Sequence, residues 1–483
     1  MTELNPAIVW RHFDTLCRIP RPSRHEAALR EHLQQWAMSR GLSTEVDGIG
    51  NLLIRKPGQH GCEHAATLVL QGHLDMVCQS NEGVQHDFLQ DPIQTTLEGD
   101  WLRAPGTTLG ADNGIGVALC LALLEDAETS HGPLEVLLTV DEEAGMGGAH
   151  GLQPGWLTGK IMLNLDTEEW GEFYLGCAGG LDVYASRHAA ADTVPAGWVT
   201  QQIRLTGLRG GHSGVNIHED RGNAIKLLVR VLYQLERDTG LRWAHLRGGS
   251  ARNALPREAF ATVALPAEQQ CALLAGIDQW QTTLCAELGD VEPQLQLRCV
   301  PTDAASALLP PSEQRIWSRS LLAAPHGVHR MSQKVAGVVE TSNNLGMLDI
   351  RPEGGEVNFM VRSLVDSAAQ ALGDEIDALW SLSSSQVRIE GHYPGWAPNP
   401  ASPLLAVCQE VYQQQTGEPS KVQVIHAGLE CGLIQARYPD MDIVSFGPTI
   451  RGAHAPGEAV HVPSVADCWT LLQAIARRLA EVN

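Results

Sequence analysis

Apolar residues in this chain gather into short runs that stop at polar or charged residues. The runs are TLVLQG before His73, LEVLLTV (134–140) before DEEAG, KIMLNL (160–165) before Asp166, and MDIVSFGP (441–448), which a short loop separates from His454. Continuous apolar runs with helical patterns between some of them indicate strands that are buried on both faces. The pattern therefore predicts an α/β fold in which a mostly parallel central sheet is covered by helices.

Helix signals lie between and before these runs. Ser23 and Glu26 fit a capping box ahead of AALREHLQQWAMSR, and Gly41 stands where a glycine commonly ends a helix. The segment TTLGADNG precedes the apolar helical stretch GIGVALCLALLEDA, which places Asp112 on the turn that enters a helix.

Five residues that can bind metal ions occupy equivalent places in this pattern. His73, Glu143, Asp166 and His454 follow apolar runs, and Asp112 opens a helix. Ligand sites in such sheets lie beyond the C-terminal ends of the strands. Three clustered carboxylates repel one another unless cations neutralise them, and two imidazoles with three carboxylates suit zinc, cobalt or manganese. If Asp112 bridges two ions, each ion receives three protein groups and keeps open positions, as in a catalytic site.

Further carboxylates near these positions could assist catalysis. Asp75 could accept a hydrogen bond from the far nitrogen of a ligand imidazole, although an ordinary turn cap is the alternative. Hydrolysis also needs a general base, and the run DEEAG offers one. Spacing alone leaves open which of Asp141, Glu142 and Glu143 binds metal and which takes a proton. The pair Glu168 and Glu169 is a competing candidate that we expect to be exposed.

Length and composition bear on the number of domains and on the kinds of partner that the protein can have. A chain of 483 residues is too long for a single hydrophobic core, so we expect two domains or more. Its net charge of −22 argues against nucleic acid or an anionic membrane as a partner. We find neither a signal peptide nor an apolar run long enough to span a bilayer. The eleven cysteines form no C-x-x-C pair, which is typical of reduced thiols in a cytoplasmic protein.

The motifs resemble those of a known family. HLDMV, TTLGADNGIG, DEEAGMGGA, NLDTEE, GGHSG, ARNALPREAF, HAGLECG and the late His454 are similar to the di-zinc metallopeptidases that include aminoacylase, carboxypeptidase G and bacterial dipeptidases. The resemblance covers essentially the whole chain. It implies a cytoplasmic, homodimeric dipeptidase that acts on unblocked dipeptides, including Xaa-His dipeptides such as β-Ala-His.

The resemblance also assigns roles to residues. One metal ion would be held by His73, Asp112 and Asp166, and the second by Asp112, Glu143 and His454. Glu142 would be the general base that activates the attacking water, and Asp75 would orient a ligand. The peptide bond after Asp112 is expected to be cis.

The family fold adds an α+β lid and dimerisation domain, inserted into the catalytic one. The expected bounds are 1–186 and 395–483 for the catalytic domain and 187–394 for the lid, with strands at 201–208 and 356–364. His212, Asn253 and Arg362 would reach the substrate from the lid: an imidazole N–H for the oxyanion, an amide donor and a carboxylate-binding fork. Gly428 would line the substrate pocket. The residues alone favour plainer interpretations, namely a glycine turn around His212 and an interstrand charge at Arg362.

Two positions depart from the family pattern. Asp141 stands where threonine is common, and it could raise the pKa of Glu142 if it points inward. Gly457 replaces an acidic residue after the last ligand. Neither change removes a ligand.

The metal residues alone do not separate the activities within this family. An N-acyl-amino-acid deacylase or a carboxypeptidase of the same family would share every one of them. The retained Glu142 argues against a non-catalytic binding protein. The oxygen-rich ligand set, without thiolates, argues against a purely structural metal protein.

Overall fold

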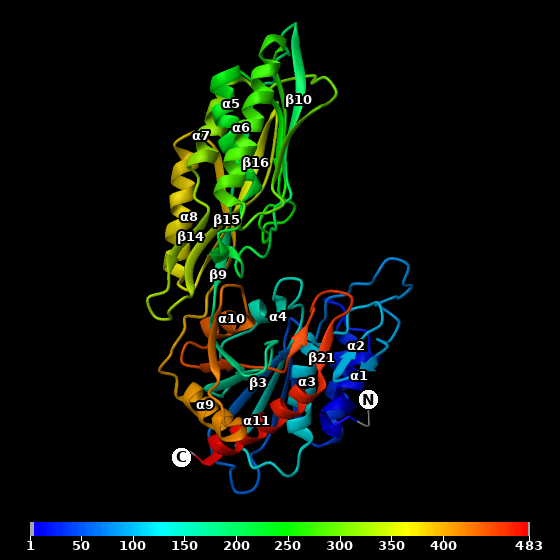
Figure 1. Ribbon diagram of the computed structural model, residues 1–483. Helices are drawn as coiled ribbons and strands as arrows, with labels where there is room; N and C mark the ends of the chain where they lie inside the picture. The colour runs from blue at the N-terminus through cyan, green and yellow to red at the C-terminus, as the bar shows by residue number, and fades with distance from the viewer. Residues whose placement is uncertain (1–3, 482–483) are drawn as a thin grey trace. The chain divides into compact units, whose positions relative to one another are not determined.

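The computed structural model describes residues 4–481, which form two compact units (Figure 1). The first contains residues up to Gly176, Trp396–Val424 and the residues from Leu429, and the second contains Cys177–Gly395 and Ile425–Gly428. The second unit begins before residue 187 because strand β9 (Gly179–His188) pairs with β16 (Gly354–Ser363) and β17 (Gln386–Tyr393), which belong to that unit. Every helix within residues 4–481 is too short or too polar to span a bilayer.

An eight-stranded sheet of order β1-β2-β6-β3-β7-β19-β8-β18 is the centre of the first unit. Its strands are β1 (Ser43–Val46), β2 (Leu52–Lys56), β3 (Leu68–His73), β6 (Leu134–Thr139), β7 (Ile161–Asn164), β8 (Glu172–Cys177), β18 (Lys421–Ile425) and β19 (Asp442–Ser445). The four runs that the sequence predicts as strands are the adjacent strands β6, β3, β7 and β19, and they are parallel. The predicted α/β fold with a buried parallel centre is thus confirmed.

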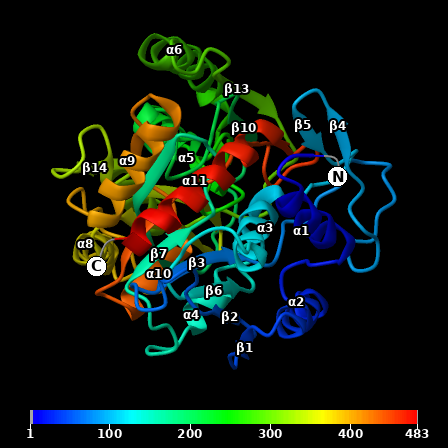
Figure 2. The ribbon, with the colours of Figure 1, turned by 90° about the horizontal axis from the view of Figure 1, so that it is seen from below.

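Helices cover this sheet because their apolar sides need burial. They are α1 (Ala7–Arg18), α2 (Ala27–Ser39), α3 (Ala111–Glu125), α4 (Gly147–Gly151), α9 (Pro403–Thr416), α10 (Glu430–Arg437) and α11 (Val462–Glu481). Helix α3 is buried along nearly its whole length and packs between α1 and α11 (Figure 2). A small antiparallel sheet joins β4 (Thr96–Glu98), β5 (Trp101–Arg103), β20 (Ile450–Arg451) and β21 (Ala459–His461).

The start of α2 differs from the expected capping box. Glu26 is the N-cap residue, and no side chain in the described part of the chain caps the helix. Ser23 donates instead to Asp75 at 2.7 Å, and Glu26 accepts the N–H of Asp141 at 2.8 Å. The end of α2 agrees with the sequence, since Gly41 has a φ of 73° and donates to the carbonyl of Met38.

The second unit is a larger antiparallel sheet with helices on one face (Figure 1). Besides β9, β16 and β17, its strands are β10 (Trp198–Thr206), β11 (Arg242–Gly248), β12 (Ala259–Pro266), β13 (Gln296–Pro301), β14 (Gly327–Met331) and β15 (Val339–Arg351). Its α-helices are α5 (Ala224–Thr239), α6 (Gln270–Leu288), α7 (Pro311–Ala323) and α8 (Asp366–Ser381). Strands β10 and β16 confirm the two strands expected at 201–208 and 356–364.

Candidate active site

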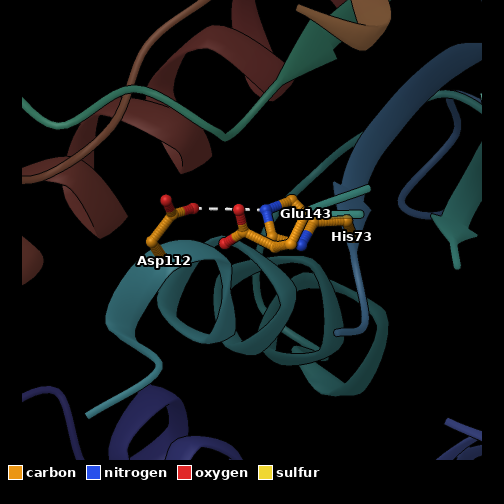
Figure 3. A group of neighbouring side chains, drawn as sticks. All are labelled: His73, Asp112 and Glu143. Atoms are coloured by element: carbon orange, nitrogen blue, oxygen red, sulfur yellow. Dashed lines mark hydrogen bonds and ion pairs between the residues drawn. The ribbon is translucent and has the colours of Figure 1, made fainter. Parts of the chain in front are cut away.

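The C-terminal edge of the central sheet brings the five candidate metal ligands together. Ligand atoms of His73, Asp112 and Glu143 all lie within 4.8 Å of one another, and Figure 3 shows them converging from the end of β3, the start of α3 and the segment after β6. His73 Nε2 lies 3.4 Å from Asp166 Oδ1. His454 Nε2 lies 3.1 Å from both Asp112 Oδ2 and Glu143 Oε2.

Asp112 is the centre of this group. Its Oδ1 faces His73 Nε2 at 3.2 Å, while its Oδ2 faces His454. One carboxylate with a histidine on each oxygen is the arrangement that a bridging ligand between two ions requires. The peptide bond between Asp112 and Asn113 is cis, which confirms the expectation from the resemblance.

The donor set fits divalent cations. Asp166 Oδ1 and Glu143 Oε1 are buried and have no hydrogen-bond partner among residues 4–481. A buried carboxylate oxygen is costly unless it accepts a hydrogen bond or binds a cation. Hydrogen bonds to Asp112 and Glu143 raise the pKa of His454 to about 11. The carboxylates therefore hold a proton on this imidazole when no metal ion takes its place.

Asp75 links the ligands to the segment after β6. Its Oδ1 lies 3.3 Å from His73 Nδ1 and accepts the N–H of Glu142 at 3.0 Å, and its Oδ2 accepts the N–H of Glu143 at 3.1 Å. The pKa of Asp75 is lowered to about 2 because hydrogen bonds from His73 and Ser23 outweigh the effect of burial. An ionised Asp75 facing Nδ1 leaves Nε2 of His73 free to bind a cation.

The side chains of Glu142 and Asp141 lie in different surroundings. Burial raises the pKa of Glu142 well above its usual range, and the charges of Asp166, Glu430 and Glu143 add to this effect. Asp141 Oδ1 instead pairs with Arg24 Nε at 3.1 Å, and the Arg24 side chain is 71% exposed. Asp141 is thus paired with Arg24, and it is not among the main charges that raise the pKa of Glu142.

In the second unit, Ser213 connects three of the residues expected to bind substrate. Its N–H donates to the carbonyl of Asn253 at 2.8 Å, and its hydroxyl accepts from Arg362 Nε at 3.3 Å. His212 precedes it, and Gly214 follows it where a Cβ would lie 1.8 Å from the carbonyl oxygen of His426. Gly214, the last glycine of GGHSG, is therefore required because two main chains approach each other closely at this position. The Asn253 side chain itself is exposed, and Gly428 is half-buried after β18.

The tautomer of His212 follows from its neighbours. The N–H groups of Gly214 and Val215 both donate to Nδ1, at 3.2 and 3.0 Å. The proton of the neutral ring is therefore on Nε2, where it can donate to an oxyanion. Nη2 of Arg362 lies 3.4 Å from this nitrogen, which makes the contact one between two donors and not a hydrogen bond.

We expect the His212 imidazole to be neutral at pH 7. Burial, with a smaller effect from the Arg362 charge, lowers its pKa to about 4. NMR titration of the imidazole should give a midpoint below pH 5, and the variant Arg362→Ala should raise it only modestly because burial is the larger cause. A midpoint near 6.5 in the unmodified protein would contradict this geometry.

Several residues of these sites carry no signal in the sequence. Arg21 and Glu458 bind the main chain around Asp112, Glu430 accepts hydrogen bonds from Gln71 and Thr139 at 2.6 Å each, and Tyr393 accepts one from Arg362 Nη1 at 3.0 Å.

Arg362 is buried, and among the described residues of its unit only neutral groups contact its guanidinium. A buried cation of this kind is suited to bind an anionic group.

The chain is similar to known peptidases. Residues 69–478 match the model of peptidase family M20/M25/M40. The chain is 45% identical over 479 residues, 99% of both chains, to a protein of Escherichia coli K12 named cytosol non-specific dipeptidase. It is similar to the crystal structure of aminoacylhistidine dipeptidase from Vibrio alginolyticus, with a TM-score of 0.91, 45% identity and coverage of 99% and 97% of the two chains. Aminopeptidase PepT from Bacillus cereus shares the fold, with a TM-score of 0.58, 15% identity and coverage of 99% and 100%.

Proposed function

The chain belongs to peptidase family M20/M25/M40, and on this premise we propose that it is a metal-dependent dipeptidase that hydrolyses unblocked dipeptides, Xaa-His dipeptides such as β-Ala-His among them. The observation that carries the proposal is the cluster of two histidines and three carboxylates around Asp112, with buried carboxylate oxygens that lack a hydrogen bond. The names of the two relatives at 45% identity support the dipeptide as substrate.

Two divalent cations, for which zinc is the first candidate and cobalt or manganese the alternatives, would polarise the peptide carbonyl and acidify the attacking water. His73, Asp112 and Asp166 would hold one ion, and Asp112, Glu143 and His454 the other. Asp75 keeps the His73 ring oriented through Nδ1.

The chain's own groups then move the proton and bind the substrate. Glu142 takes a proton from the attacking water on a carboxylate oxygen and returns it to the nitrogen of the leaving amine. His212 donates its Nε2–H to the carbonyl oxygen as negative charge develops there. Arg362 pairs with the free carboxylate of the dipeptide, and Asn253 and Gly428 are further candidates for substrate contact.

Hydrolysis assays test the reaction directly. The zinc-loaded protein should cleave β-Ala-His and several α-dipeptides, lose this activity on chelation, and leave N-acetyl amino acids intact. Cleavage of the blocked substrates alone would instead indicate a deacylase. Absence of any cleavage with two ions bound would indicate a binding protein.

The buried guanidinium of Arg362 gives a prediction about substrate affinity. Arg362→Ala should lower kcat/KM for dipeptides by about 30-fold or more, because removing one partner of a buried charge pair costs on the order of 2–5 kcal/mol. The effect should fall mainly on KM. Dipeptide amides, which lack the carboxylate, are the matched substrates: the variant should hydrolyse them about as well as the unmodified protein does. An equal loss on both substrate types would contradict the assignment.

We further propose a cytoplasmic homodimer in which the second unit acts as lid and dimerisation domain. The word "cytosol" in the relative's name supports the location, and the family resemblance supports the assembly. Light scattering should give twice the chain mass of 52.2 kDa. A mass of one chain would reject the dimer without affecting the proposed reaction.

A further inference from the structure

The main chain that enters α3 donates four hydrogen bonds to one carboxylate. Glu458 Oε2 accepts the N–H groups of Leu109 and Gly110 at 2.7 and 2.9 Å, and Oε1 accepts those of Ala111 and Asp112 at 2.7 and 3.2 Å. Gly110, the N-cap residue, has no side chain to satisfy these donors and has a φ of 69°. Glu458, 346 residues along the chain from Asp112, therefore satisfies the donors that a local cap usually satisfies.

Glu458 shares its loop with a candidate metal ligand. His454 and Glu458 both lie between β20 and β21. The His454 side chain is 53% exposed, whereas Glu458 is buried. Within the loop, Ala455 donates to Gly452 at 3.2 Å and Glu458 donates to Ala455 at 3.1 Å. The carboxylate of Glu458 is thus the buried anchor that ties the His454 loop to the segment carrying Asp112.

Arg21 holds the same segment from the other side. Its Nη2 donates to the carbonyl of Gly110, and its Nη1 donates to the carbonyls of Leu74 and Asp75 at 2.9 Å each. Gly110 therefore gives its N–H to Glu458 and its carbonyl to Arg21. All of these bonds are made to main-chain atoms, so they fix the position of the backbone that carries the ligands.

The two candidate ion positions differ in how their ligands are held. His73 ends β3, and Asp166 follows β7, and these two strands are paired neighbours in the sheet. The sheet itself thus sets the distance between His73 and Asp166. His454 comes from a loop outside this sheet, and no strand pairing within residues 4–481 sets its distance from Asp112.

We propose that Glu458 is a positioning residue that sets the affinity for the second metal ion, the one between Asp112, Glu143 and His454. This inference rests on the proposed two-metal function. Glutamine at this position would keep one acceptor oxygen but would turn an NH₂ group toward two N–H donors. Arg21 would still hold the Asp112 segment beside His73, so the His454 loop would move away from it while His73, Asp112 and Asp166 stay in place.

Zinc titration of the full-length protein tests this inference. Glu458→Gln should bind a first Zn²⁺ within about threefold of the unmodified affinity and a second at least about tenfold more weakly, and added zinc should restore turnover. Glu458→Asp, which keeps the charge on a shorter side chain, should show a smaller loss. Circular dichroism checks that each variant is folded, and the aspartate variant decides the test if the glutamine variant does not fold.

Glu135→Gln is the matched control. Glu135 is also a buried carboxylate that accepts main-chain N–H groups, from Thr158 at 2.8 Å and Gly159 at 3.0 Å, but it lies at the opposite end of the central strands. Its variant should lower the Tm and leave both zinc affinities unchanged. The inference is overturned if Glu458→Gln binds both ions normally or weakens both equally. An unmodified protein that binds fewer than two ions would overturn the two-metal function as well.

Discussion

Replacing Glu142 by glutamine should lower kcat by a factor of about 10²–10⁴, the usual contribution of a general base. The reason is that Glu142 lies beside the cluster and its carboxylate takes no part in the contacts among the candidate ligands. The amide is similar in size but cannot accept and return the proton. KM and the number of bound zinc ions should change little, because the main chain of Glu142 stays bonded to Asp75. Steady-state kinetics and metal analysis measure both quantities.

Asp141→Asn provides the control for this experiment. Asp141 is the adjacent carboxylate, and it pairs with the exposed Arg24. We expect this variant to keep kcat within about threefold of the unmodified enzyme, since it changes an ion pair with an exposed arginine. If Glu142→Gln behaves like this control, Glu142 is not the base.

Removal of metal should abolish hydrolysis and lower the Tm. A ligand present at 100 times its Kd stabilises a folded protein by about 2.7 kcal/mol, which corresponds to roughly 5–10 °C for a domain of 150–250 residues. Chelated protein should therefore melt several degrees lower, and added zinc should restore both activity and Tm. If the protein keeps full activity after its metal content falls below about 0.1 ion per chain, the reaction does not depend on metal.

The pH dependence of the metal-free protein follows from His454. Its pKa of about 11 in the folded chain exceeds the ordinary value of 6.5, so its proton contributes stability that is fully present below pH 6.5. This contribution is lost as the pH rises through about 11. The Tm of the metal-free protein should thus decrease as the pH rises from 6.5 to about 11. The Tm of the zinc-loaded protein should not decrease in this way, because the cation replaces the proton. Calorimetry of both forms at several pH values measures the difference.

The centre of the fold could be predicted because its pattern is local. Strands β3, β6, β7 and β19 are each a continuous apolar run, and their neighbouring positions follow from the burial that such runs require. The residues just past them could be selected as metal ligands because carboxylates and imidazoles are distinctive at strand ends. The general base was not separable from its neighbours by spacing, and the family resemblance supplied that assignment.

The residues that hold the ligands could not be predicted in the same way. Glu458 and Arg21 bind main-chain N–H and carbonyl groups, which every residue except proline has, so no partner residue type reveals them. Ser23 and Glu26 have the local pattern of a capping box, but their side chains are bonded to Asp75 and Asp141. A local pattern fails here because a distant segment competes for the same side chains.

The order of the strands also has a consequence for synthesis on the ribosome. β19 pairs with β7, although nearly the whole second unit lies between them in the chain. Until residues 442–445 emerge, β7 has an unpaired edge, and such edges promote aggregation. The last candidate metal ligand, His454, and its anchor, Glu458, emerge later still. On the proposed function, a chain that lacks these residues has an open sheet and an incomplete metal centre, so enzymatic activity would report that translation has passed residue 458.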